Sequence, residues 1–310
     1  MRRVLGLVLL GLFGFLITVG LLAQFYAPGQ VKKTPLNINT VTNLNGSGSY
    51  LGAAVTPVSV WQRTVALGKK STSSVAAMQN FQCVMKDADG TAPKSPVCPD
   101  ASSANLIDAS PDSFATDRVT ALAVNGSQYT GADAVPHEGL INKFPFDVQK
   151  KTYPFWDGVV GKAVDASFQG QEKVKGLNTY KFNVSLSDQP ATIAPGTTGT
   201  YSDDKTMWID PVTGSIINQT EHQVRKLDSG DTALDLTLAF TDATVKTNVD
   251  DANTNISQLN LIGNLPWISY VLALVSLGGG LLLLRGTAAA SSARDDAGLD
   301  SLIDSKTRRG

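Results

Sequence analysis

The sequence predicts a mainly β (β-rich α+β) extracytoplasmic domain, built from antiparallel sheet and flanked by two transmembrane α-helices. Two apolar runs of twenty residues, Val4–Ala23 and Leu265–Leu284, contain no ionisable side chain. At about 1.5 Å per residue, each run makes a helix of roughly 30 Å, the thickness of the hydrocarbon core of a bilayer. The segment between them contains alternating apolar and polar residues, which are typical of antiparallel strands.

Basic residues near the two apolar runs predict the orientation. Arg2 and Arg3 precede the first run, and Arg285 and Arg294 follow the second. Two lysines at 32–33 lie on the opposite side and weaken the asymmetry. Because positive charge is enriched in cytoplasmic segments, both termini are expected in the cytoplasm of a plasma-membrane protein. The expected parts are a cytoplasmic N-terminus (1–3), a transmembrane helix (4–25), an extracytoplasmic β-rich domain (26–264), a second transmembrane helix (265–284) and a cytoplasmic tail (285–310).

The first apolar run has a second interpretation as a cleaved signal peptide, because Met1–Arg3 is a plausible basic n-region. The run is longer than a usual h-region, and its far end, Ala23–Pro28, has no clear small-x-small cleavage site. A retained anchor is the preferred interpretation, and cleavage stays open as the alternative.

Small residues spaced four apart occur in both apolar runs. Gly14 with Thr18, and Ser276 with Gly280, allow close approach of another helix, which is either the other anchor or a larger membrane partner. Neither run contains the acidic, basic or His side chains that proton relays and ion pathways need. The chain is therefore not expected to be an ion-coupled transporter by itself.

The two cysteines, Cys83 and Cys98, both lie in the predicted extracytoplasmic segment. Two cysteines in an exported, loop-rich stretch predict a disulfide rather than a metal or redox site. By the chain-entropy estimate, a loop of this length contributes about 3 kcal/mol to stability.

The clearest strands are Thr179–Leu186 and Ala233–Phe240, where apolar and polar residues alternate. Thr206–Ile209 and Ser215–Ile217 flank the turn Asp210–Gly214, so a hairpin with a bulge is expected there. Weaker patterns predict strands over Thr56–Leu67, Val119–Val124 and Glu221–Leu227, a short helix within Ser71–Val84, and long loops over Lys86–Asp117 and Asp188–Asp204.

Charge and motif content exclude several classes of function. The net charge is −1, and a mildly acidic domain is not expected to bind nucleic acid. No HExxH, CxxC, GxSxG or Walker motif accompanies His137 or His222. The adjacent acids 203–204 and 250–251 point to opposite faces of an extended strand, so neither pair chelates a metal by itself. We expect no catalytic residue, no cofactor, no metal and no enzymatic activity.

The most unusual segment is Phe144–Asp157, which holds five aromatic residues and two aromatic–proline bonds. Proline removes backbone donors, so a stiff irregular ribbon rather than a strand is expected. Its rings either plug one end of a sheet or form a lip over an apolar cavity. The candidate ligand-binding residues are Phe144, Phe146, Tyr153, Phe155, Trp156, Tyr180, Phe182, Trp208, Leu236, Leu238 and Phe240.

Phe144–Asp157 and Met207–Gly214 together resemble the signature of an actinobacterial two-pass envelope family, labelled the PorA family or a domain of unknown function. The resemblance spans nearly the whole chain. The family includes the mycobacterial polar growth factor, which is linked to the biogenesis of envelope lipids and lipoglycans and to the exporter of mycolate lipids. The porin label fits poorly, because outer-membrane barrels use many alternating strands and no apolar helix of this length.

Three functional hypotheses follow. The first, which the resemblance implies, is a non-enzymatic envelope factor that binds or handles mycolate-type glycolipid outside the plasma membrane and cooperates with a lipid exporter in envelope assembly and polar growth. The second is a scaffold that recruits envelope-assembly partners without binding lipid, and the third is an envelope glycan or lipid enzyme. An apolar volume large enough for an acyl chain favours the first, and a tightly packed core favours the second.

Overall fold

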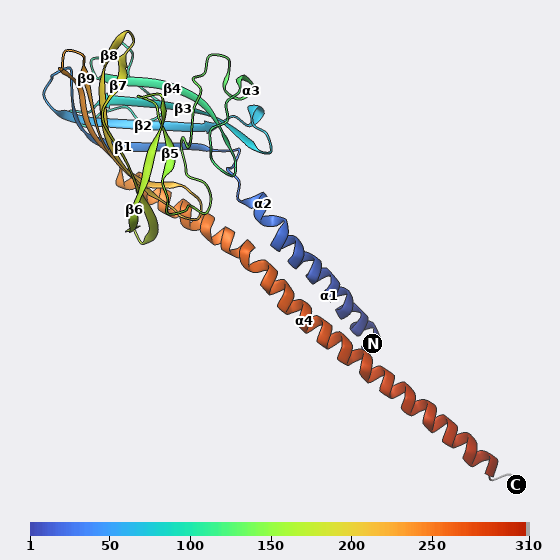
Figure 1. Ribbon diagram of the computed structural model, residues 1–310. Coiled ribbons are helices and arrows are strands. Elements are labelled where there is room, and N and C mark those ends of the chain that lie inside the picture. The colour runs from blue at the N-terminus through green and yellow to red at the C-terminus, as the bar shows by residue number, and fades with distance from the viewer. Residues whose placement is uncertain (308–310) are drawn as a thin grey trace. The chain divides into compact units, whose positions relative to one another are not determined.

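The computed structural model describes the backbone of residues 1–307 and the side chains of residues 1–285. The chain forms two compact units (Figure 1). The β unit spans Lys32–Ile256, and the helical unit combines Met1–Val31 with the chain from Ser257 onward. The β unit is therefore somewhat shorter at both ends than the segment between the two apolar runs.

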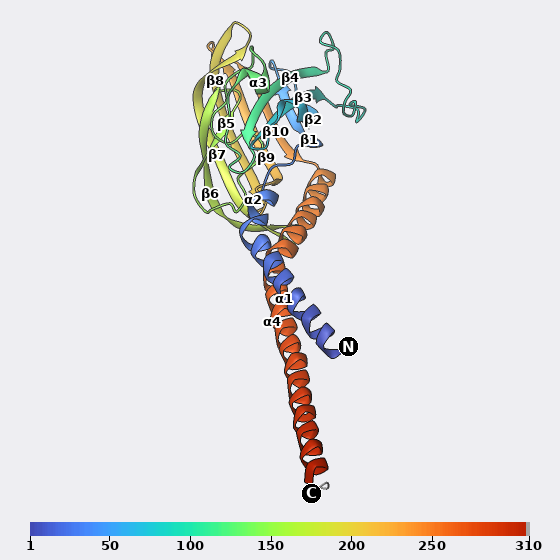
Figure 2. The same ribbon diagram turned by 90° about the vertical axis from the view of Figure 1, so that its right-hand side faces the viewer.

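The β unit is one antiparallel sheet of ten strands, which confirms the predicted fold class. Its spatial order is β4-β3-β2-β1-β10-β9-β8-β7-β6-β5, so two meanders meet where β1 pairs with β10. The sheet curls strongly (Figure 2). The strands are β1 (Asn39–Tyr50), β2 (Thr56–Ala66), β3 (Val75–Lys86), β4 (Leu106–Asp117), β5 (Tyr153–Asp157), β6 (Lys162–Val174), β7 (Leu177–Ala194), β8 (Thr197–Ile209), β9 (Ile216–Leu227) and β10 (Thr232–Phe240).

Two short segments join the outer strands of the curled sheet, β4 and β5. Residues 121–124 bond to β4, residues 139–141 bond to β5, and the two segments bond to each other. This pairing satisfies backbone groups that an open sheet edge leaves exposed. The hydrogen bonds are Val124 N–H to Ala115 O (2.8 Å), Ala123 N–H to Gly139 O (2.8 Å), Leu140 N–H to Pro154 O (2.8 Å) and Trp156 N–H to Leu140 O (2.6 Å).

The strongest strand predictions are confirmed. Thr179–Leu186 lies within β7, and Ala233–Phe240 lies within β10. The predicted hairpin is formed by β8 and β9, with a register shift between Trp208 and Ile209. The weaker strand predictions at Thr56–Leu67 and Glu221–Leu227 also correspond to strands.

Other predictions were wrong. Ser71–Val84 is not a helix, because β3 runs from Val75 and buries residues on both faces, which hides the period-2 pattern. Val119–Val124 is a turn followed by isolated bridges rather than a strand. The loops expected over Lys86–Asp117 and Asp188–Asp204 contain β4 and the long β7–β8 hairpin. Part of the expected irregular ribbon, Tyr153–Asp157, is strand β5, at the end of the sheet order where proline is tolerated.

Strand β1 had no clear sequence signal because it is polar and contains two glycines. A Cβ at Gly46 would lie 1.8 Å from Thr237 O, and one at Gly48 would lie 2.6 Å from Asp235 O. Glycine is therefore required where β1 approaches the backbone of β10.

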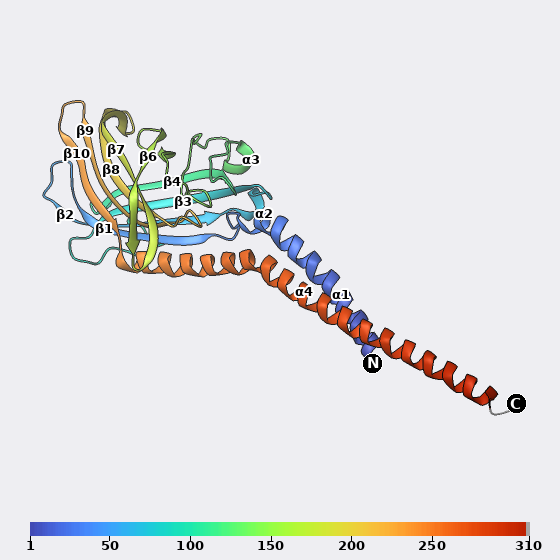
Figure 3. The same cartoon turned by 60° about the horizontal axis from the view of Figure 1, so that its bottom comes forward.

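The helical unit contains α1 (Arg2–Phe25), α2 (Ala27–Val31) and most of α4 (Asp242–Thr307). Arg2–Phe25 and Asp242–Arg285 are long and apolar enough to cross a membrane. The first turns of α4 belong to the β unit and run alongside its strands (Figure 3). Val245, Val249 and Ala252 on these turns are buried. The remaining short helices are α3 (Ser127–Thr130) and η1 (Gly68–Lys70).

Within the helical unit, α1 and α4 contact each other through small residues. A Cβ at Gly6 would lie 3.2 Å from Gly280 O, and one at Gly20 would lie 2.4 Å from Cε1 of Tyr270. The Tyr270 hydroxyl donates to Gln24 Oε1 at 2.7 Å. Gly280 therefore serves contact between the anchors, as one of the two interpretations predicts, whereas a Cβ at Gly14 would have no neighbour within 4 Å.

Candidate functional site

The inner face of the sheet carries two apolar clusters separated by charged residues. Directly paired residues of antiparallel strands share a face, so the register defines rows across β7, β8, β9 and β10. The apolar clusters contain Phe144, Tyr153, Phe155, Phe182, Val184 and Met207 in the first, and Leu44, Val58, Val60, Val84, Leu234, Leu236 and Leu238 in the second.

Three rows connect the apolar residues through polar ones. The first runs from Val184 through Lys205 and Glu221 to Leu238. The second is Leu186–Asp203–Gln223–Leu236, and the third is Tyr201–Arg225–Leu234. We call Tyr201, Asp203, Lys205, Glu221 and Arg225 the inner charged cluster.

Lys205 is the centre of the inner charged cluster. Its ammonium lies 3.3 Å from Asp203 Oδ2 and 3.5 Å from Glu221 Oε1. Burial opposes the charge of Lys205, but Glu221 and Asp203 outweigh it and hold the pKa of Lys205 well above its ordinary value. The lysine is therefore charged and is shared by two carboxylates.

Asp203 is the least satisfied member of the cluster. It is 2 % exposed, neither carboxylate oxygen has a hydrogen-bond partner among the described residues, and its charge is held by the 3.3 Å ion pair with Lys205. Burial raises the pKa of Asp203 to about 7; Lys205 opposes this increase, and Glu221 and Asp157 add to it. Buried polar atoms normally have partners, so the free acceptors of Asp203 are an exception that needs a cause.

Tyr201 and Asp157 close one side of the cluster. The Tyr201 hydroxyl donates to Asp157 Oδ2 over a long 3.4 Å, and Asp157 Oδ1 accepts the backbone N–H groups of Val159 and Val160. A pocket of about 520 Å³ lies next to this turn. Its lining includes Val159, Val160, Gly161, Pro190, Thr192, Thr198, Gly199 and Asp228.

The prediction that adjacent acids face opposite sides is confirmed at residues 203–204. Asp203 is buried on the inner face, whereas Asp204 is exposed and accepts a hydrogen bond from Asn183 Nδ2 at 2.6 Å. This pair gives a matched comparison between the two faces at one point of β8.

The structure brings most of the predicted ligand-binding residues into the two apolar clusters. Phe144 packs 4.7 Å from Phe182 and 5.3 Å from Tyr153, measured between ring centroids. Phe155 belongs to the same cluster, and Tyr180 packs against it. Leu236 and Leu238 belong to the second cluster, with Phe240 against it.

Three predicted residues lie outside both clusters and are half-buried. Phe146 lies under the Lys143 ammonium, 4.0 Å from the ring centroid. Trp156 packs 4.6 Å from His137, and the Trp208 indole donates to Glu172 Oε2 at 3.0 Å.

The two segments that carry the family resemblance are neighbours in space. Phe144 N–H donates to Gly214 O, and Val148 N–H donates to Pro211 O, both at 2.8 Å. A Cβ at Gly214 would lie 2.1 Å from Phe144 O, so only glycine fits this contact. The side chain of Asp210 is buried and accepts the N–H of Thr213 at 2.9 Å, which fixes the turn.

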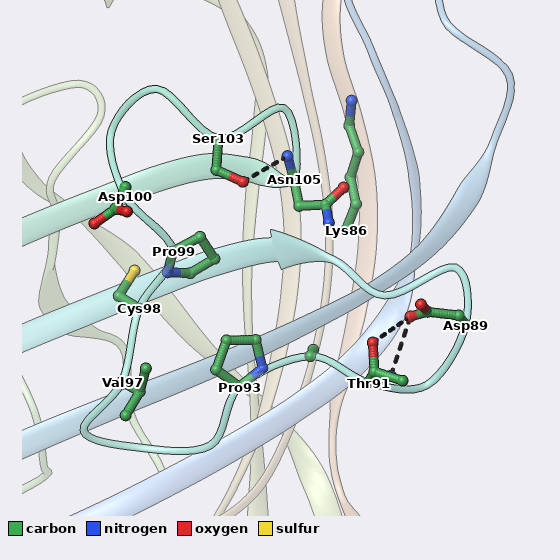
Figure 4. A pocket seen from close by; sticks show the side chains of 11 residues that line it. Lys86, Asp89, Thr91, Pro93, Val97, Cys98, Pro99, Asp100, Ser103 and Asn105 are labelled. Atoms are coloured by element: carbon green, nitrogen blue, oxygen red, sulfur yellow. Dashed lines mark hydrogen bonds between the residues drawn. The ribbon is translucent and has the colours of Figure 1, made fainter.

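The predicted disulfide between Cys83 and Cys98 is present and confirms that prediction. It holds the loop after β3 against the sheet, where Trp61 Nε1 donates to Val97 O at 3.0 Å. A pocket of about 400 Å³ is formed by this loop (Figure 4). Its lining contains both polar and apolar side chains, and includes none of the predicted aromatic residues. Within it, the Thr91 hydroxyl donates a hydrogen bond to Asp89, and the Asn105 N–H donates one to the Ser103 hydroxyl.

Sequence reasoning missed Tyr201, Lys205, Glu221 and Arg225. The available signal was period 2 in β8, where residues 201, 203, 205, 207 and 209 share one face. Because residues 188–204 were predicted to form a loop, positions 201 and 203 were not included in the strand, and the alternation was missed.

These features define a membrane-associated protein with a curled antiparallel sheet and two helices that are candidate membrane spans. The chain belongs to the PorA family, since the family model described as "Porin PorA" matches residues 5–282. A "Porin PorA" of Corynebacterium amycolatum is 28% identical over 141 residues, which cover 41% of this chain and 33% of that protein. The match thus spans about a third of the relative's length, and a membrane or envelope location fits the family.

Solved structures resemble the chain only weakly. An S-type phycobiliprotein lyase from Guillardia theta matches with a TM-score of 0.24 and 9% identity over 64% of this chain and 84% of that one. A LolA superfamily protein from Nitrosomonas europaea matches with a TM-score of 0.15 and 9% identity over 71% of this chain and 91% of that one. Neither likeness supports a conclusion about function.

Proposed function

We propose that this chain is a non-enzymatic envelope factor that binds an amphiphilic envelope lipid, a glycolipid of the mycolate type, outside the plasma membrane. Both termini lie in the cytoplasm in this proposal, and the β unit works beside a lipid exporter. The observation that supports it is the composition of the inner face, where charged residues are placed between two apolar clusters in the same cross-strand rows.

The energetics of burial favour a binding role for the inner charged cluster. Taking a charge out of water costs several kcal/mol, and replacing a buried ion pair by apolar residues is often neutral or stabilising. A cluster of Lys205 with two carboxylates is therefore expected to stabilise a core less than apolar residues would, so a purely structural role does not explain it. An amphiphile has a polar head for such a cluster and apolar chains for the residues on either side.

Within each of the two clusters, the apolar side chains pack against one another. Binding of an acyl chain therefore requires some of them to separate. Val184 and Leu186 pair directly with Lys205 and Asp203. Leu234 and Leu238 pair directly with Arg225 and Glu221, so these four apolar side chains are the ones expected to contact the acyl chain.

Lipid extraction tests the proposal directly. The full chain is purified from its own membranes, exchanged into nanodiscs of phosphatidylcholine, and analysed by mass spectrometry of the extracted lipids. We expect glycolipid to remain at near one molecule per protein. An unrelated two-span protein treated identically is the control, and equal glycolipid content in both samples would contradict the proposal.

A scaffold that recruits envelope-assembly partners is the second candidate. The close packing of Phe144, Tyr153 and Phe182 favours it, because these rings fill the space that a lipid-lined cavity would need. The same extraction separates the two functions: a scaffold retains no glycolipid beyond the control.

A further inference from the structure

We infer that the inner charged cluster and the 520 Å³ pocket beside it form one binding site for a neutral, hydroxyl-rich group, such as the sugar head of an amphiphile. This inference rests on the proposed function and assigns the polar part of the ligand to particular residues. Its starting point is Asp203, whose side chain is fully buried and whose oxygens accept no hydrogen bond from the described residues.

The free acceptors of Asp203 select a ligand that donates hydrogen bonds. A hydrogen bond to a charged partner contributes about 1.5–3 kcal/mol, and leaving a buried acceptor unsatisfied is costly. Hydroxyl groups donate without carrying charge, so they satisfy a buried carboxylate at little desolvation cost. A ligand with several hydroxyls is therefore the natural partner of this side chain.

The rest of the cluster favours a neutral ligand over an ion. Lys205 already lies between two carboxylates, at 3.3 Å from Asp203 and 3.5 Å from Glu221. A cation would face the Lys205 ammonium at the position between the acids, and an anion would face Asp203 and Glu221. Sugar hydroxyls both donate and accept, which matches a site where carboxylates alternate with Lys205 and Arg225.

The pocket lies beside the Asp157 turn, its lining contains none of the five cluster residues, and in this inference the ligand enters through it. Gly199 lines the pocket and lies two residues before Tyr201 on β8, so both belong to the same face of the strand. Val160 also lines the pocket, and its N–H donates to Asp157, the acceptor of the Tyr201 hydroxyl. The Tyr201–Asp157 hydrogen bond is long, at 3.4 Å, so an entering hydroxyl can replace it with small loss.

Saccharide binding to the full chain tests the inference. The chain is placed in nanodiscs of phosphatidylcholine, and saturation-transfer NMR is recorded with maltose, sucrose and trehalose, with glucose 6-phosphate as the charged comparison. We expect at least one neutral disaccharide to bind, and Asp203→Asn to weaken its affinity about tenfold or more. Asp204→Asn, on the outer face of the same strand, is expected to bind as the wild type does.

Folding of each variant is checked by thermal unfolding, and Glu221→Gln replaces Asp203→Asn if the latter is unfolded. Absence of binding by every neutral disaccharide, stronger binding of glucose 6-phosphate, or equal affinity of the Asp203→Asn and Asp204→Asn variants would overturn the inference. Retained glycolipid without disaccharide binding would leave the proposed function standing while this site fails. Disaccharide binding without retained glycolipid would support this site and contradict the proposed function.

Discussion

Lys205 and Glu221 are direct cross-strand partners on β8 and β9, and their charged groups lie 3.5 Å apart on the inner face of the sheet. The row that contains them ends in Val184 on one side and Leu238 on the other. An ion pair is thus held inside a row that is otherwise apolar, where weak screening strengthens the attraction and desolvation opposes it.

Removing the lysine alone should destabilise the β unit. Lys205→Met leaves Asp203 and Glu221 facing each other without a cation, and breaking a buried pair in this way costs about 3–5 kcal/mol. Denaturant unfolding of the full chain in detergent measures the loss. The triple variant Asp203→Leu, Lys205→Met, Glu221→Leu has no buried charge left unpaired among these positions and should recover most of the stability. A triple variant less stable than Lys205→Met would show that the loss does not come from the unpaired carboxylates.

Asp203 should make stability depend on pH. Its pKa is raised by burial to about 7 in the folded chain, so the folded state binds the proton more tightly than the unfolded state. The contribution to stability is therefore full below about pH 4, the unfolded pKa, and is lost as the pH rises through about 7. Unfolding free energies of wild type and Asp203→Asn, compared between pH 4 and pH 8, isolate this effect. A difference that stays constant with pH would rule out the raised pKa.

Gly214 should tolerate no side chain. A Cβ there would lie 2.1 Å from Phe144 O, and the backbone φ is +76°. Gly161→Ala is the matched control, because φ is +65° but no atom lies within 4 Å of its Cβ position. We expect a loss of about 1–2 kcal/mol for Gly161→Ala, from the backbone alone. Gly214→Ala should lose clearly more in the same unfolding experiment, and equal losses would show that the contact between the two segments is loose.

The packing of the two anchors should depend on Gly20. Gly20→Val places atoms into the ring of Tyr270, whereas Gly11→Val meets nothing within 4 Å. Cysteines placed at positions 9 and 279, where a Cβ on Gly279 would lie 3.4 Å from the Leu9 side chain, report the contact by cross-linking in membranes and leave Tyr270 in place. We expect Gly20→Val to reduce cross-linking severalfold and Gly11→Val to leave it unchanged. Equal yields in the two variants would argue against this helix pairing.

Sequence patterns located strands where one face is apolar and the other polar. Residues 179–186 and 233–240 have this alternation and form parts of β7 and β10. The pattern failed where a strand is buried on both sides, as in β3, and where close strand approach requires glycine, as at Gly46 in β1. Proline in Tyr153–Asp157 also concealed β5.

The candidate site was harder to predict than the fold. Its aromatic neighbours were visible in the sequence because Phe144–Asp157 is so rich in rings. The charged residues were not, because Lys205 and Glu221 look like solvent-facing positions until the strand register places both on the inner face. The period-2 pattern of β8 shows that residues 201, 203 and 205 share a face, but register depends on pairing between segments, so this pattern does not show that Glu221 lies opposite Lys205.

The most direct measurement is the glycolipid content of the triple variant Asp203→Leu, Lys205→Met, Glu221→Leu, purified as a full chain from its own membranes beside the wild type. We predict that the wild type carries close to one glycolipid per protein and that the folded triple variant loses most of it. Equal glycolipid in both proteins, or none in the wild type, would contradict the role of the inner charged cluster in binding.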